Sequence, residues 1–276
     1  MIELPEAVVL PGQIETTLIG KRVGEVTVLQ SPHKFAWFLG EPETYPERLR
    51  HKTVTSAEHH GGMVQVRLGD TSLVFHEGPS LRYITDPSGI PKKHQLLVEF
   101  TDSSFLSASI QMYGGIICFE HDEWDNEYYH AACSKPSPLT DAFTRDYFDE
   151  IRGIAGFEKH SAKTFLATEQ RVPGVGNGVI QDILFNARIH PKRKMGSLTK
   201  PELSNLFESL RTTLRTMVES GGRDTEKDLF GEPGGYRTIL SRNTVNTACP
   251  RCGDIIEKAN HAGGSIYFCA TCQPRA

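Results

Sequence analysis

Four cysteines near the C-terminal end of the chain have the spacing of a metal site. Cys249, Cys252, Cys269 and Cys272 follow the pattern C-x2-C-x16-C-x2-C. Each CxxC turn can present two thiolates to one ion, and four sulfur ligands in a tetrahedral array favour zinc. Such a set leaves no coordination position for a substrate, so we expect one structural Zn²⁺ and not a catalytic one. Free cysteines in a core and an iron–sulfur cluster are the alternatives.

The residues between the two cysteine pairs suit a β-hairpin. Residues 258–268 read KANHAGGSIYF, and Gly263–Gly264 is the expected tight turn. The other two cysteines, Cys118 and Cys133, stand apart in the sequence. This usage is typical of a metal-binding protein in a reducing compartment and argues against a disulfide framework.

A second candidate site is the glycine-rich segment VPGVGNG at 172–178, which directly precedes the helical pattern VIQDILFNARI. A glycine-rich turn that opens a helix exposes backbone N–H groups at the positive end of the helix dipole. The segment therefore suits a phosphate group. A plain corner between two helices is the alternative.

The first half of the chain has the sequence pattern of a β-sheet. Strand-like alternation of β-branched and aromatic residues occurs at 23–30, 62–68, 71–78, 94–102 and 107–120, between segments rich in Gly, Pro, Asp or Ser. This spacing predicts an antiparallel sandwich or barrel. Pro5 suits the first turn of a helix, and the apolar stripe that follows continues up to Gly20, so a helix leads into the sheet.

The second half of the chain has helical periodicity. The segment KPSPLT at 135–140 marks the boundary, and apolar residues then recur three and four apart in four segments, at 141–154, 161–170, 177–189 and 198–220. Thr199 and Glu202 form a capping box. A glycine-rich stretch at 221–238 links the helices to the hairpin. We therefore expect an α+β protein with domains at 1–135, 136–228 and 240–276.

The composition excludes several classes of protein. The 276 residues are 38% hydrophobic and 23% charged, as in ordered globular domains, and the length suits two domains plus a small appendage. The formal charge of −4 excludes a surface that is basic throughout, although 188–194 (RIHPKRK) is locally basic. No stretch is long and apolar enough to span a membrane, and the N-terminus lacks a signal-peptide pattern. We expect a cytoplasmic protein without a membrane partner.

Several motifs in order along the chain carry a family resemblance. They are E-L-P-E at 3–6, P-G-V-G-N at 173–177, A-R-I-H-P at 187–191 and the cysteine hairpin with Y-F-C at 267–269. With these motifs the chain resembles the formamidopyrimidine-DNA glycosylase and endonuclease VIII family of base-excision repair enzymes along its whole length. The resemblance implies an N-terminal β-sandwich, a helix–two-turn–helix domain and a C-terminal zinc finger. It also implies a monomer that grips damaged or abasic double-stranded DNA and flips the damaged nucleotide into a pocket.

Three groups that the family uses for strand cleavage are missing from their positions. The family's N-terminal proline, whose amine attacks C1′, is replaced by Ile2, and Met1 is expected to remain because Met removal needs a small second residue. Gly62 stands at the position of the family's lysine, and no lysine occurs from Thr53 to Pro91. Gly264 stands at the position of the arginine at the tip of the zinc hairpin. Strand-cleaving (AP lyase) activity is therefore expected to be weak or absent.

Other family residues have counterparts here. Glu3 matches the family's proton donor and is the expected catalytic carboxyl group, together with the Met1 amine; Glu6 is expected to be structural. A first-turn glutamate that only stabilises the helix dipole is the alternative for Glu3.

The resemblance also transfers DNA contacts. It implies that His94, Lys163 and Asn177 contact phosphate or the lesion and that Tyr113 is the aromatic wedge. The family's void-filling Met and Arg are replaced by Pro79 and Gln111.

Three functions remain open on these grounds. The first is a DNA glycosylase, in which Glu3 activates water or the Met1 amine forms a Schiff base. The second is a catalytically silent binder of damaged or abasic DNA. The third, more distant, is an RNA-binding or protein-interaction module on the same scaffold.

Overall fold

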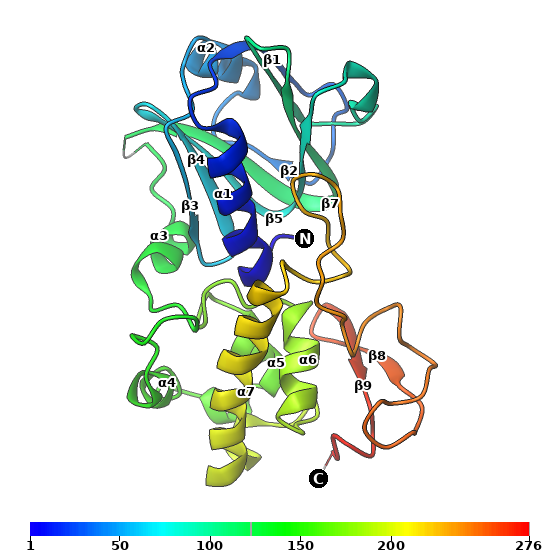
Figure 1. Ribbon diagram of the computed structural model, residues 1–276. Helices are drawn as coiled ribbons and strands as arrows, with labels where there is room; N and C mark the ends of the chain where they lie inside the picture. The colour runs from blue at the N-terminus through cyan, green and yellow to red at the C-terminus, as the bar shows by residue number, and fades with distance from the viewer. Residues whose placement is uncertain (122, 276) are drawn as a thin grey trace.

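The computed structural model describes residues 1–121 and 123–275 and consists of two lobes and a C-terminal hairpin (Figure 1). The sheet lobe comprises helix α1 and strands β1–β7, and the helical lobe comprises helices α4–α7. The N-terminus lies between the two lobes, and the hairpin of β8 and β9 lies beside the helical lobe. This arrangement confirms the expected α+β class with an antiparallel sheet, a helical region and a C-terminal hairpin.

Helix α1 (Leu4–Leu18) carries the N-terminal segment into the sheet lobe. Pro5 occupies the first turn, where its missing N–H costs nothing, and Gly20 with a φ of 82° follows the helix end. Leu10, Ile14 and Leu18 are buried on one face. The helix packs through this face against β3 and β4, and this contact fixes the place of residues 1–3 at the junction of the lobes.

The sheet lobe is one hydrogen-bonded sheet that encloses its own core. The strand order is β1-β6-β7-β5-β4-β3, with β2 parallel to β7. Val26 of β1 and Val98 of β6 share a hydrophobic cluster with Val66 of β4 and Ala57 of β3. Since these strands lie at opposite ends of the strand order, the sheet must fold over on itself, as a sandwich does. The strands are β1 (Val23–Val28), β2 (Ala36–Trp37), β3 (Ser56–His60), β4 (Met63–Leu68), β5 (Thr71–Ile84), β6 (Leu96–Phe100) and β7 (Phe105–Glu120).

A β-bulge interrupts the pairing of the two longest strands, β5 and β7, between Glu77 and Pro79. A side chain on Gly78 would place its Cβ 1.9 Å from the carbonyl oxygen of Tyr113, and one on Gly114 would lie 2.7 Å from Cδ of Pro79. Both positions therefore require glycine. The bulge allows the two strands to cross closely and turns Tyr113 towards the N-terminus.

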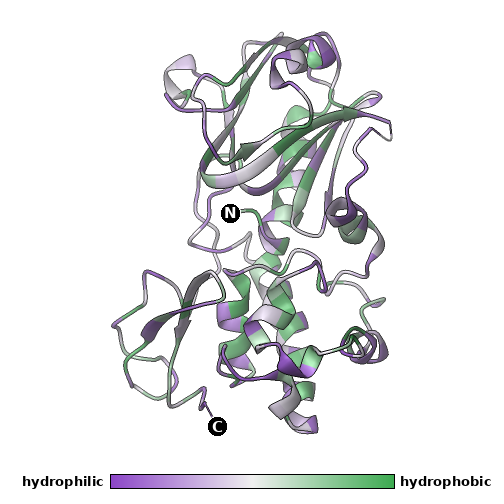
Figure 2. Cartoon of the chain, turned by 180° about the vertical axis from the view of Figure 1, so that it is seen from behind, coloured by the Kyte–Doolittle hydropathy of each residue, from purple (hydrophilic) through white to green (hydrophobic). Residues whose placement is uncertain are grey.

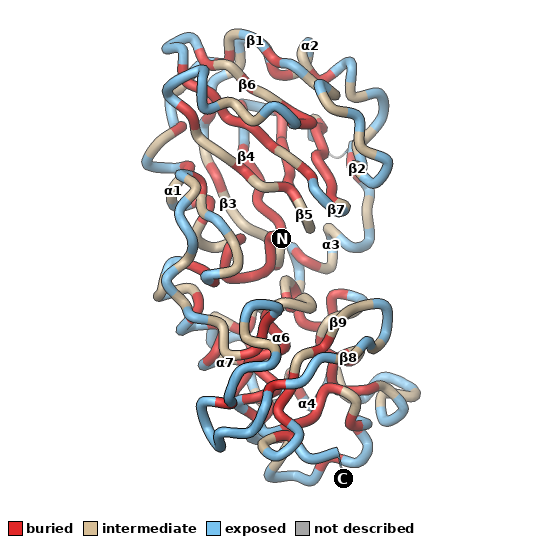
Figure 3. Tube along the Cα trace, turned by 90° about the vertical axis from the view of Figure 1, so that its right-hand side faces the viewer, coloured by how far each residue is buried: buried red, intermediate tan, exposed pale blue. Residues whose placement is uncertain are grey.

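The helical lobe matches the predicted helical segments. Its helices are α4 (Arg145–Ile151), α5 (Ala162–Ala167), α6 (Val179–Asn186) and α7 (Lys200–Glu219). The predicted capping box at the start of α7 is present, because Thr199 N–H donates to Glu202 and Glu202 N–H bonds the Thr199 hydroxyl. Phe148, Phe165, Ile183 and Leu210, one from each helix, are buried in one hydrophobic cluster. Hydrophobic and hydrophilic residues alternate along these helices in Figure 2, and buried positions alternate with exposed ones in Figure 3.

Two short helices were not predicted from the sequence. Helix α2 (Tyr45–Leu49) lies against β1, and helix α3 (Glu127–Ser134) packs on β3. Four 3-10 turns, at Pro42–Thr44, Pro87–Gly89, Phe157–Lys159 and Met195–Ser197, complete the described elements. No helix among the described residues is long and apolar enough to cross a membrane.

The glycine-rich stretch after α7 does more than link two parts of the chain. It returns to the sheet lobe, where Leu229 is fully buried in the core and its carbonyl oxygen accepts a hydrogen bond from Tyr83 N–H at 2.8 Å. It also carries a buried arginine, Arg223, into the junction of the lobes. The stretch therefore fastens the helical lobe to the sheet lobe.

The C-terminal hairpin forms as predicted, but its turn is one residue earlier. Strands β8 (Glu257–His261) and β9 (Gly264–Phe268) pair with His261 opposite Gly264, so the turn residues are Ala262 and Gly263. Both have positive φ values, 47° and 74°, as a two-residue hairpin turn of this kind requires. The prediction that Gly263–Gly264 forms the turn was wrong, since Gly264 already pairs as the first residue of β9.

Candidate functional site

The four cysteines of the hairpin meet at one point. Their Sγ atoms all lie within 4.8 Å of one another, with 3.8 Å between Cys249 and Cys272 and 3.5 Å between Cys252 and Cys269. A tetrahedral zinc with Zn–S bonds of about 2.3 Å separates its sulfurs by about 3.8 Å. The set fits a structural zinc ion, because four protein thiolates fill the coordination sphere.

The hairpin tip docks on the helical lobe through two of the residues predicted to contact DNA. The Lys163 ammonium donates to the carbonyl oxygen of His261 at 2.6 Å, and the Asn177 amide donates to that of Ser265 at 3.1 Å. A Cβ on Gly264 would lie 3.1 Å from Nζ of Lys163 and 3.5 Å from Oδ1 of Asn177. The structure therefore brings Lys163, Asn177 and the tip of the hairpin together.

The N-terminal segment is held on both sides at the junction of the lobes. Ile2 N–H donates to the carbonyl oxygen of Glu77 in β5 at 2.6 Å, and Leu4 N–H donates to that of Gly174 in the loop before α6 at 2.8 Å. The Met1 amino group pairs with the carboxylate of Glu226. The amine and Glu3 are therefore held between the sheet and the glycine-rich loop.

Glu3 occupies the N-terminal end of α6. Its Oε1 accepts a hydrogen bond from Gly178 N–H at 2.8 Å and its Oε2 one from Val179 N–H at 2.7 Å. A Cβ on Gly176 would lie 2.5 Å from Oε1 of Glu3. Only glycine at position 176 therefore lets the loop approach the carboxylate this closely. The glycine-rich turn does bind an anion through its N–H groups, as its pattern predicts, but that anion is a side chain of the same protein.

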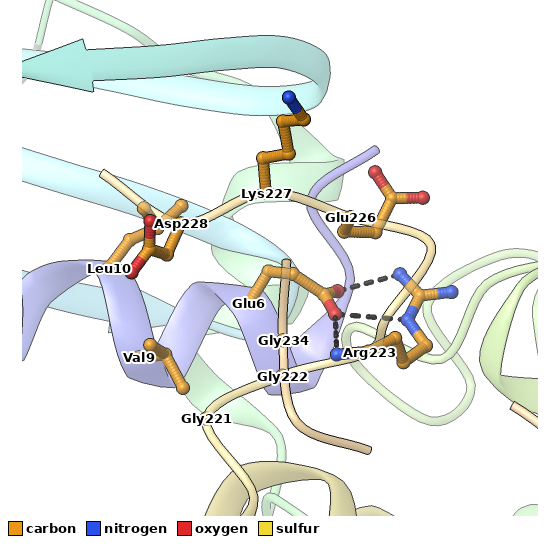
Figure 4. Close-up of a pocket in the computed structure, with 10 residues that line it drawn as sticks. All are labelled: Glu6, Val9, Leu10, Gly221, Gly222, Arg223, Glu226, Lys227, Asp228 and Gly234. Carbon is orange, nitrogen blue, oxygen red and sulfur yellow. Dashed lines mark hydrogen bonds and ion pairs between the residues drawn. The ribbon is translucent and has the colours of Figure 1, made fainter. Parts of the chain in front are cut away.

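A buried arginine joins Glu3 to Glu6. Arg223 is 2% exposed, and its Nη1 lies 3.1 Å from Oε2 of Glu3. Its Nε and Nη2 donate to Glu6 at 3.0 and 2.6 Å, as Figure 4 shows. Glu6 also accepts a hydrogen bond from the backbone N–H of Glu3 at 3.2 Å. Glu6 is thus tied to the backbone and to Arg223, in line with the structural role expected for it.

The pKa values of Glu3 and Glu6 are shifted in opposite directions, because the single cation between them acts more strongly on Glu6. Burial raises the pKa of Glu3 above its ordinary value, although the Arg223 charge opposes this shift. Burial acts on Glu6 as well, but the charge and the hydrogen bonds of Arg223 together hold the pKa of Glu6 below its ordinary value. Of the two, Glu3 is therefore the one whose environment favours proton uptake.

The turn at the family's lysine position lies against the glycine-rich loop. A Cβ on Gly61 would lie 2.9 Å from Cβ of Pro173, and one on Gly62 would lie 3.2 Å from Cα of Gly174 and 3.7 Å from Cα of Glu3. The absence of a side chain at Gly62 therefore lets the β3–β4 turn approach the loop and the N-terminal segment.

Tyr113 lies opposite the bulge at Gly78, and it forms with Phe35, Trp37 and Met112 a group of apolar side chains that we call the apolar tip. Its ring centroid is 5.8 Å from that of Trp37, and its hydroxyl lies 3.9 Å from Sδ of Met1. Phe35 and Met112 beside it are 51% and 66% exposed. This apolar tip has the composition of a surface that inserts between bases.

His94 lies deeper than a phosphate-contacting residue needs to be. It is 6% exposed, and its Nδ1 lies 2.8 Å from the carbonyl oxygen of Pro91. Its Nε2 is buried and has no hydrogen-bond partner among the described residues. A phosphate contact by His94 remains a prediction, and it requires the ring to become accessible.

Sequence reasoning missed Arg223, because nothing in the stretch GGRDTEK marks it as buried. One signal was available. Two glutamates three residues apart at the start of a buried helix need a cation, since a buried carboxylate without a partner is very costly. The position of that cation in the chain could not be read from the sequence.

Three domain models match the chain, and two of them are named for one protein family. The formamidopyrimidine-DNA glycosylase N-terminal domain matches residues 1–109, the formamidopyrimidine-DNA glycosylase H2TH domain matches 135–228, and the zinc finger found in FPG and IleRS matches 248–275. The matched ranges lie in the sheet lobe up to the first part of β7, in the helical lobe with the start of the returning stretch, and in the cysteine hairpin.

Proteins named formamidopyrimidine-DNA glycosylase match over the full length. That of Lactobacillus delbrueckii subsp. bulgaricus is 26% identical over 289 residues and that of Bacillus cereus 27% over 282, each with 100% of both chains covered. That of Marinomonas sp. is 28% identical over 281 residues, covering 99% of this chain and 100% of the relative.

Solved structures share the fold. The Lactococcus lactis Fpg in complex with abasic-site DNA has a TM-score of 0.82 at 22% identity, with 98% of this chain and 99% of that one covered. MutM (Fpg) from Thermus thermophilus has a TM-score of 0.80 at 22% identity, with 99% of both chains covered. With its three domains, their order and their full-length relatives, this chain belongs to the formamidopyrimidine-DNA glycosylase family.

Proposed function

We propose that this protein is a DNA glycosylase that acts as a monomer on damaged or abasic duplex DNA by nucleotide flipping, with weak or absent strand cleavage. The observation that carries the proposal is the position of Met1 and Glu3. Both lie where the sheet lobe meets the glycine-rich loop, between the apolar tip at Tyr113 and the hairpin contact at Lys163 and Asn177. A duplex held by the tip and the hairpin would present one nucleotide to this segment.

Weak strand cleavage is argued from the state of the amine. A Schiff base needs an amine that is free to attack C1′, whereas the Met1 amine is held in an ion pair with the Glu226 carboxylate. The family's proline and lysine positions hold Ile2 and Gly62, so neither supplies a replacement nucleophile. A covalent route would have to begin by breaking the pair with Glu226.

Base release with water as the nucleophile does not need the Met1 amine. Oε1 of Glu3 accepts one hydrogen bond, from Gly178, and a carboxylate oxygen can accept two. A water on the second lone pair of Oε1 would be oriented by a group whose pKa burial raises above its ordinary value. Such a carboxyl group can take the proton of the attacking water.

A catalytically silent binder is the second candidate, and one observation favours it. The contacts of Glu3 with Gly178, Val179 and Arg223 join the two lobes, so the carboxylate has an architectural use even without catalysis. Retention of Glu3 by itself therefore does not separate the two functions. Activity measurements on a matched pair of variants do.

The test combines base release with borohydride trapping on duplexes that contain a panel of oxidised, ring-opened, alkylated and abasic nucleotides. The expected result is base release without a covalent adduct, lost in Glu3→Gln and retained in Glu6→Gln. Glu6→Gln is the matched control because it alters the same buried cluster through the same substitution. Thermal melting of both variants separates lost chemistry from lost folding.

Each other outcome decides against part of the proposal. A borohydride adduct on an abasic duplex at the rate of base release would overturn the weak-cleavage claim. Binding of abasic duplex without release of any base in the panel would support the silent binder. No duplex binding at low salt would remove both candidates.

A further inference from the structure

A cavity of about 400 Å³ opens in the sheet lobe beside the N-terminal segment. Its lining includes Trp37, His76, Glu77, Trp124 and Tyr128. Ligand sites of small molecules begin at about this size and combine aromatic walls with a few polar groups. This cavity is separate from the cluster of Glu3, Glu6 and Arg223, and the family resemblance assigned it no role.

We propose that this cavity receives a planar aromatic cation, in particular a purine base that carries a positive charge after alkylation on a ring nitrogen. The inference rests on the proposed function, because it names the class of base that the glycosylase would take from DNA. The aromatic walls, the carboxylate and the position beside Met1 each support it.

The aromatic side chains of the walls lie close to one another. The Trp37 and His76 ring centroids lie 6.0 Å apart at an interplanar angle of 22°, and those of His76 and Trp124 lie 6.0 Å apart at 31°. Trp37 is 44% exposed, whereas Trp124 is 9% exposed. One tryptophan therefore stands where a ligand would enter and the other lines the interior. Aromatic cages of this kind attract cations through the negative faces of their rings.

The walls themselves add no positive charge. Burial lowers the pKa of His76 to about 4, so its imidazole is neutral at physiological pH, and its Nδ1 is buried with no hydrogen-bond partner among the described residues. A neutral imidazole can donate to or accept from the polar edge of a base.

Glu77 is the acidic side chain of the cavity. Burial, together with the nearby charge of Glu3, raises the pKa of Glu77, and a hydrogen bond with Tyr128 and the Met1 amino group oppose this shift. A cation bound beside Glu77 would favour the ionised carboxylate. No lysine or arginine forms an ion pair with Glu77 in the described part of the chain. A carboxylate in a partly buried aromatic cavity without a cation of its own favours a cationic ligand.

The cavity adjoins the segment that would do the chemistry. The carbonyl oxygen of Glu77 accepts the hydrogen bond from Ile2 N–H, one residue from Met1 and one from Glu3. Trp37 contacts Tyr113 at the apolar tip, and the Tyr113 hydroxyl approaches Sδ of Met1. A nucleotide displaced from the duplex by Tyr113 would therefore find the cavity next to its path.

Excision of a cationic purine suits a site without strong catalytic groups. When the C1′–N9 bond breaks, its electron pair moves into the purine ring and cancels the positive charge, so the base leaves neutral without being protonated. Water forms the new bond to C1′ and gives its proton to Glu3 or to solvent. The reaction needs neither an acid at the base nor a covalent amine.

The experiment uses the full-length protein and two arms. In the first arm, 7-methylguanosine is titrated and tryptophan fluorescence is recorded, with guanosine for comparison. In the second arm, the affinity is measured for duplexes that contain 7-methylguanine, guanine or an abasic site, with a 2′-fluoro sugar at the purine nucleotides to prevent base loss. The first arm detects recognition of the free nucleoside, and the second detects recognition of the flipped base in DNA.

The expected result is a preference of about tenfold or more for the methylated duplex over the guanine duplex, lost in Trp37→Ala and in Glu77→Gln. Glu77→Gln should bind the abasic duplex as the parent does, since that duplex places no base in the cavity. Trp37→Ala also removes a ring that contacts Tyr113 at the apolar tip, so this variant is judged by the ratio of its affinities for the methylated and guanine duplexes. Phe230→Ala, which removes an exposed aromatic ring outside the cavity, is the matched control and should keep the preference. Quenching by 7-methylguanosine alone, without a preference in duplex DNA, would overturn the flipped-base assignment.

Failure of this inference is distinguishable from failure of the proposed function. If other lesions are excised while methylated and unmodified purines behave alike, the cavity assignment is wrong and the glycosylase stands. If the methylated duplex is preferred and no base is released from any duplex of the lesion panel, including the methylated duplex without the 2′-fluoro group, the cavity assignment stands and the glycosylase is overturned.

Discussion

A single buried guanidinium holds two buried carboxylates at the point where the N-terminal segment meets the helical lobe. Glu3 and Glu6 are 3% and 6% exposed, and Arg223 is 2% exposed. The cluster carries one more negative charge than positive charge when all three groups are ionised. The N–H groups of Gly178 and Val179 stabilise the second carboxylate. The stability of the junction therefore depends on Arg223 more than on any surface ion pair.

Replacement of Arg223 by methionine is expected to lower the free energy of unfolding by about 3–5 kcal/mol, because it leaves two buried carboxylates without their cation. Urea denaturation at pH 7 measures the change. Arg237→Met is the matched control, since Arg237 is exposed in the same returning stretch. A loss no larger than that of the control would show that the buried cluster does not stabilise the junction.

Sites formed by residues that are close together in the sequence could be predicted, whereas contacts between residues far apart in the sequence could not. The zinc cysteines lie within a few residues of one another in two pairs, so local geometry determines their meeting. Glu3 and Arg223 are 220 positions apart, and only the return of the glycine-rich stretch brings them together. The same holds for Glu77 and Trp37 in the aromatic cavity, which share no local pattern.

At the scale of elements, helix α7 shows how several local interactions fix one end of a helix. Thr199 and Glu202 form the capping box, and Arg193 from the preceding loop binds the Glu202 carboxylate. The hydrogen bond from Arg193 lowers the pKa of Glu202 to about 2, with further help from Thr199. The start of the longest helix is therefore sensitive to the charge on one carboxyl group.

The variant Glu202→Gln tests this linkage. Because the folded-state pKa of Glu202 lies below its unfolded value, its ionisation stabilises the fold above about pH 4.3 and the contribution is lost as the pH falls towards 2. The parent should exceed the variant by about 1–2 kcal/mol at pH 7 and by much less at pH 2.5. Urea denaturation of both proteins at each pH gives the difference between their free energies of unfolding. Effects of acid on the cysteines are common to the two proteins and cancel in this difference. A difference that does not change with pH would contradict the assignment.

Most elements were predictable because their own pattern agrees with their place in the fold. The apolar stripes of α1, α6 and α7 and the alternation in β4, β5 and β7 all face a core. Strand β3 was missed because its residues, SAEHH, are largely polar; its pairing with β4 and its contact with α1 decide its conformation. Helix α3 was missed because the acidic segment before it resembles a loop, and packing on β3 orders it.

At the scale of the molecule, the zinc hairpin is fastened to the helical lobe at two places. Its tip meets Lys163 and Asn177, and its base packs on α6, where the Arg251 guanidinium lies 4.2 Å from the ring centroid of Phe185. The metal is expected to keep these two contacts in register, because the hairpin has only two short strands of its own.

Removal of zinc should therefore release the hairpin and leave the rest folded. Treatment with a chelator, or Cys272→Ser, is expected to abolish hydrogen-exchange protection of the amides in β8 and β9 while α7 stays protected. Affinity for abasic duplex should fall at the same time, because the proposed function places one of its two DNA contacts at the hairpin. Cys118→Ser is the control, since Cys118 lies in the sheet core away from the hairpin. Full protection of the hairpin without zinc would refute a structural role for the metal.

The glycine at the hairpin tip gives a direct test of how this protein grips DNA. A Cβ on Gly264 would approach only the flexible end of Lys163 closely, and Gly264 does not have a positive φ, so a longer side chain fits once Lys163 moves. Gly264→Arg would restore a cation where the family has an arginine.

If the hairpin tip faces the DNA backbone, this arginine neutralises one further phosphate, and the plot of log affinity against log salt concentration should steepen by about 0.9. Fluorescence anisotropy of abasic duplex between about 50 and 200 mM KCl measures this slope. Asn205→Arg adds the same charge on the exposed surface of α7 and should change the slope less. Equal slopes for the two variants would mean that net charge, and not the hairpin tip, accounts for the effect.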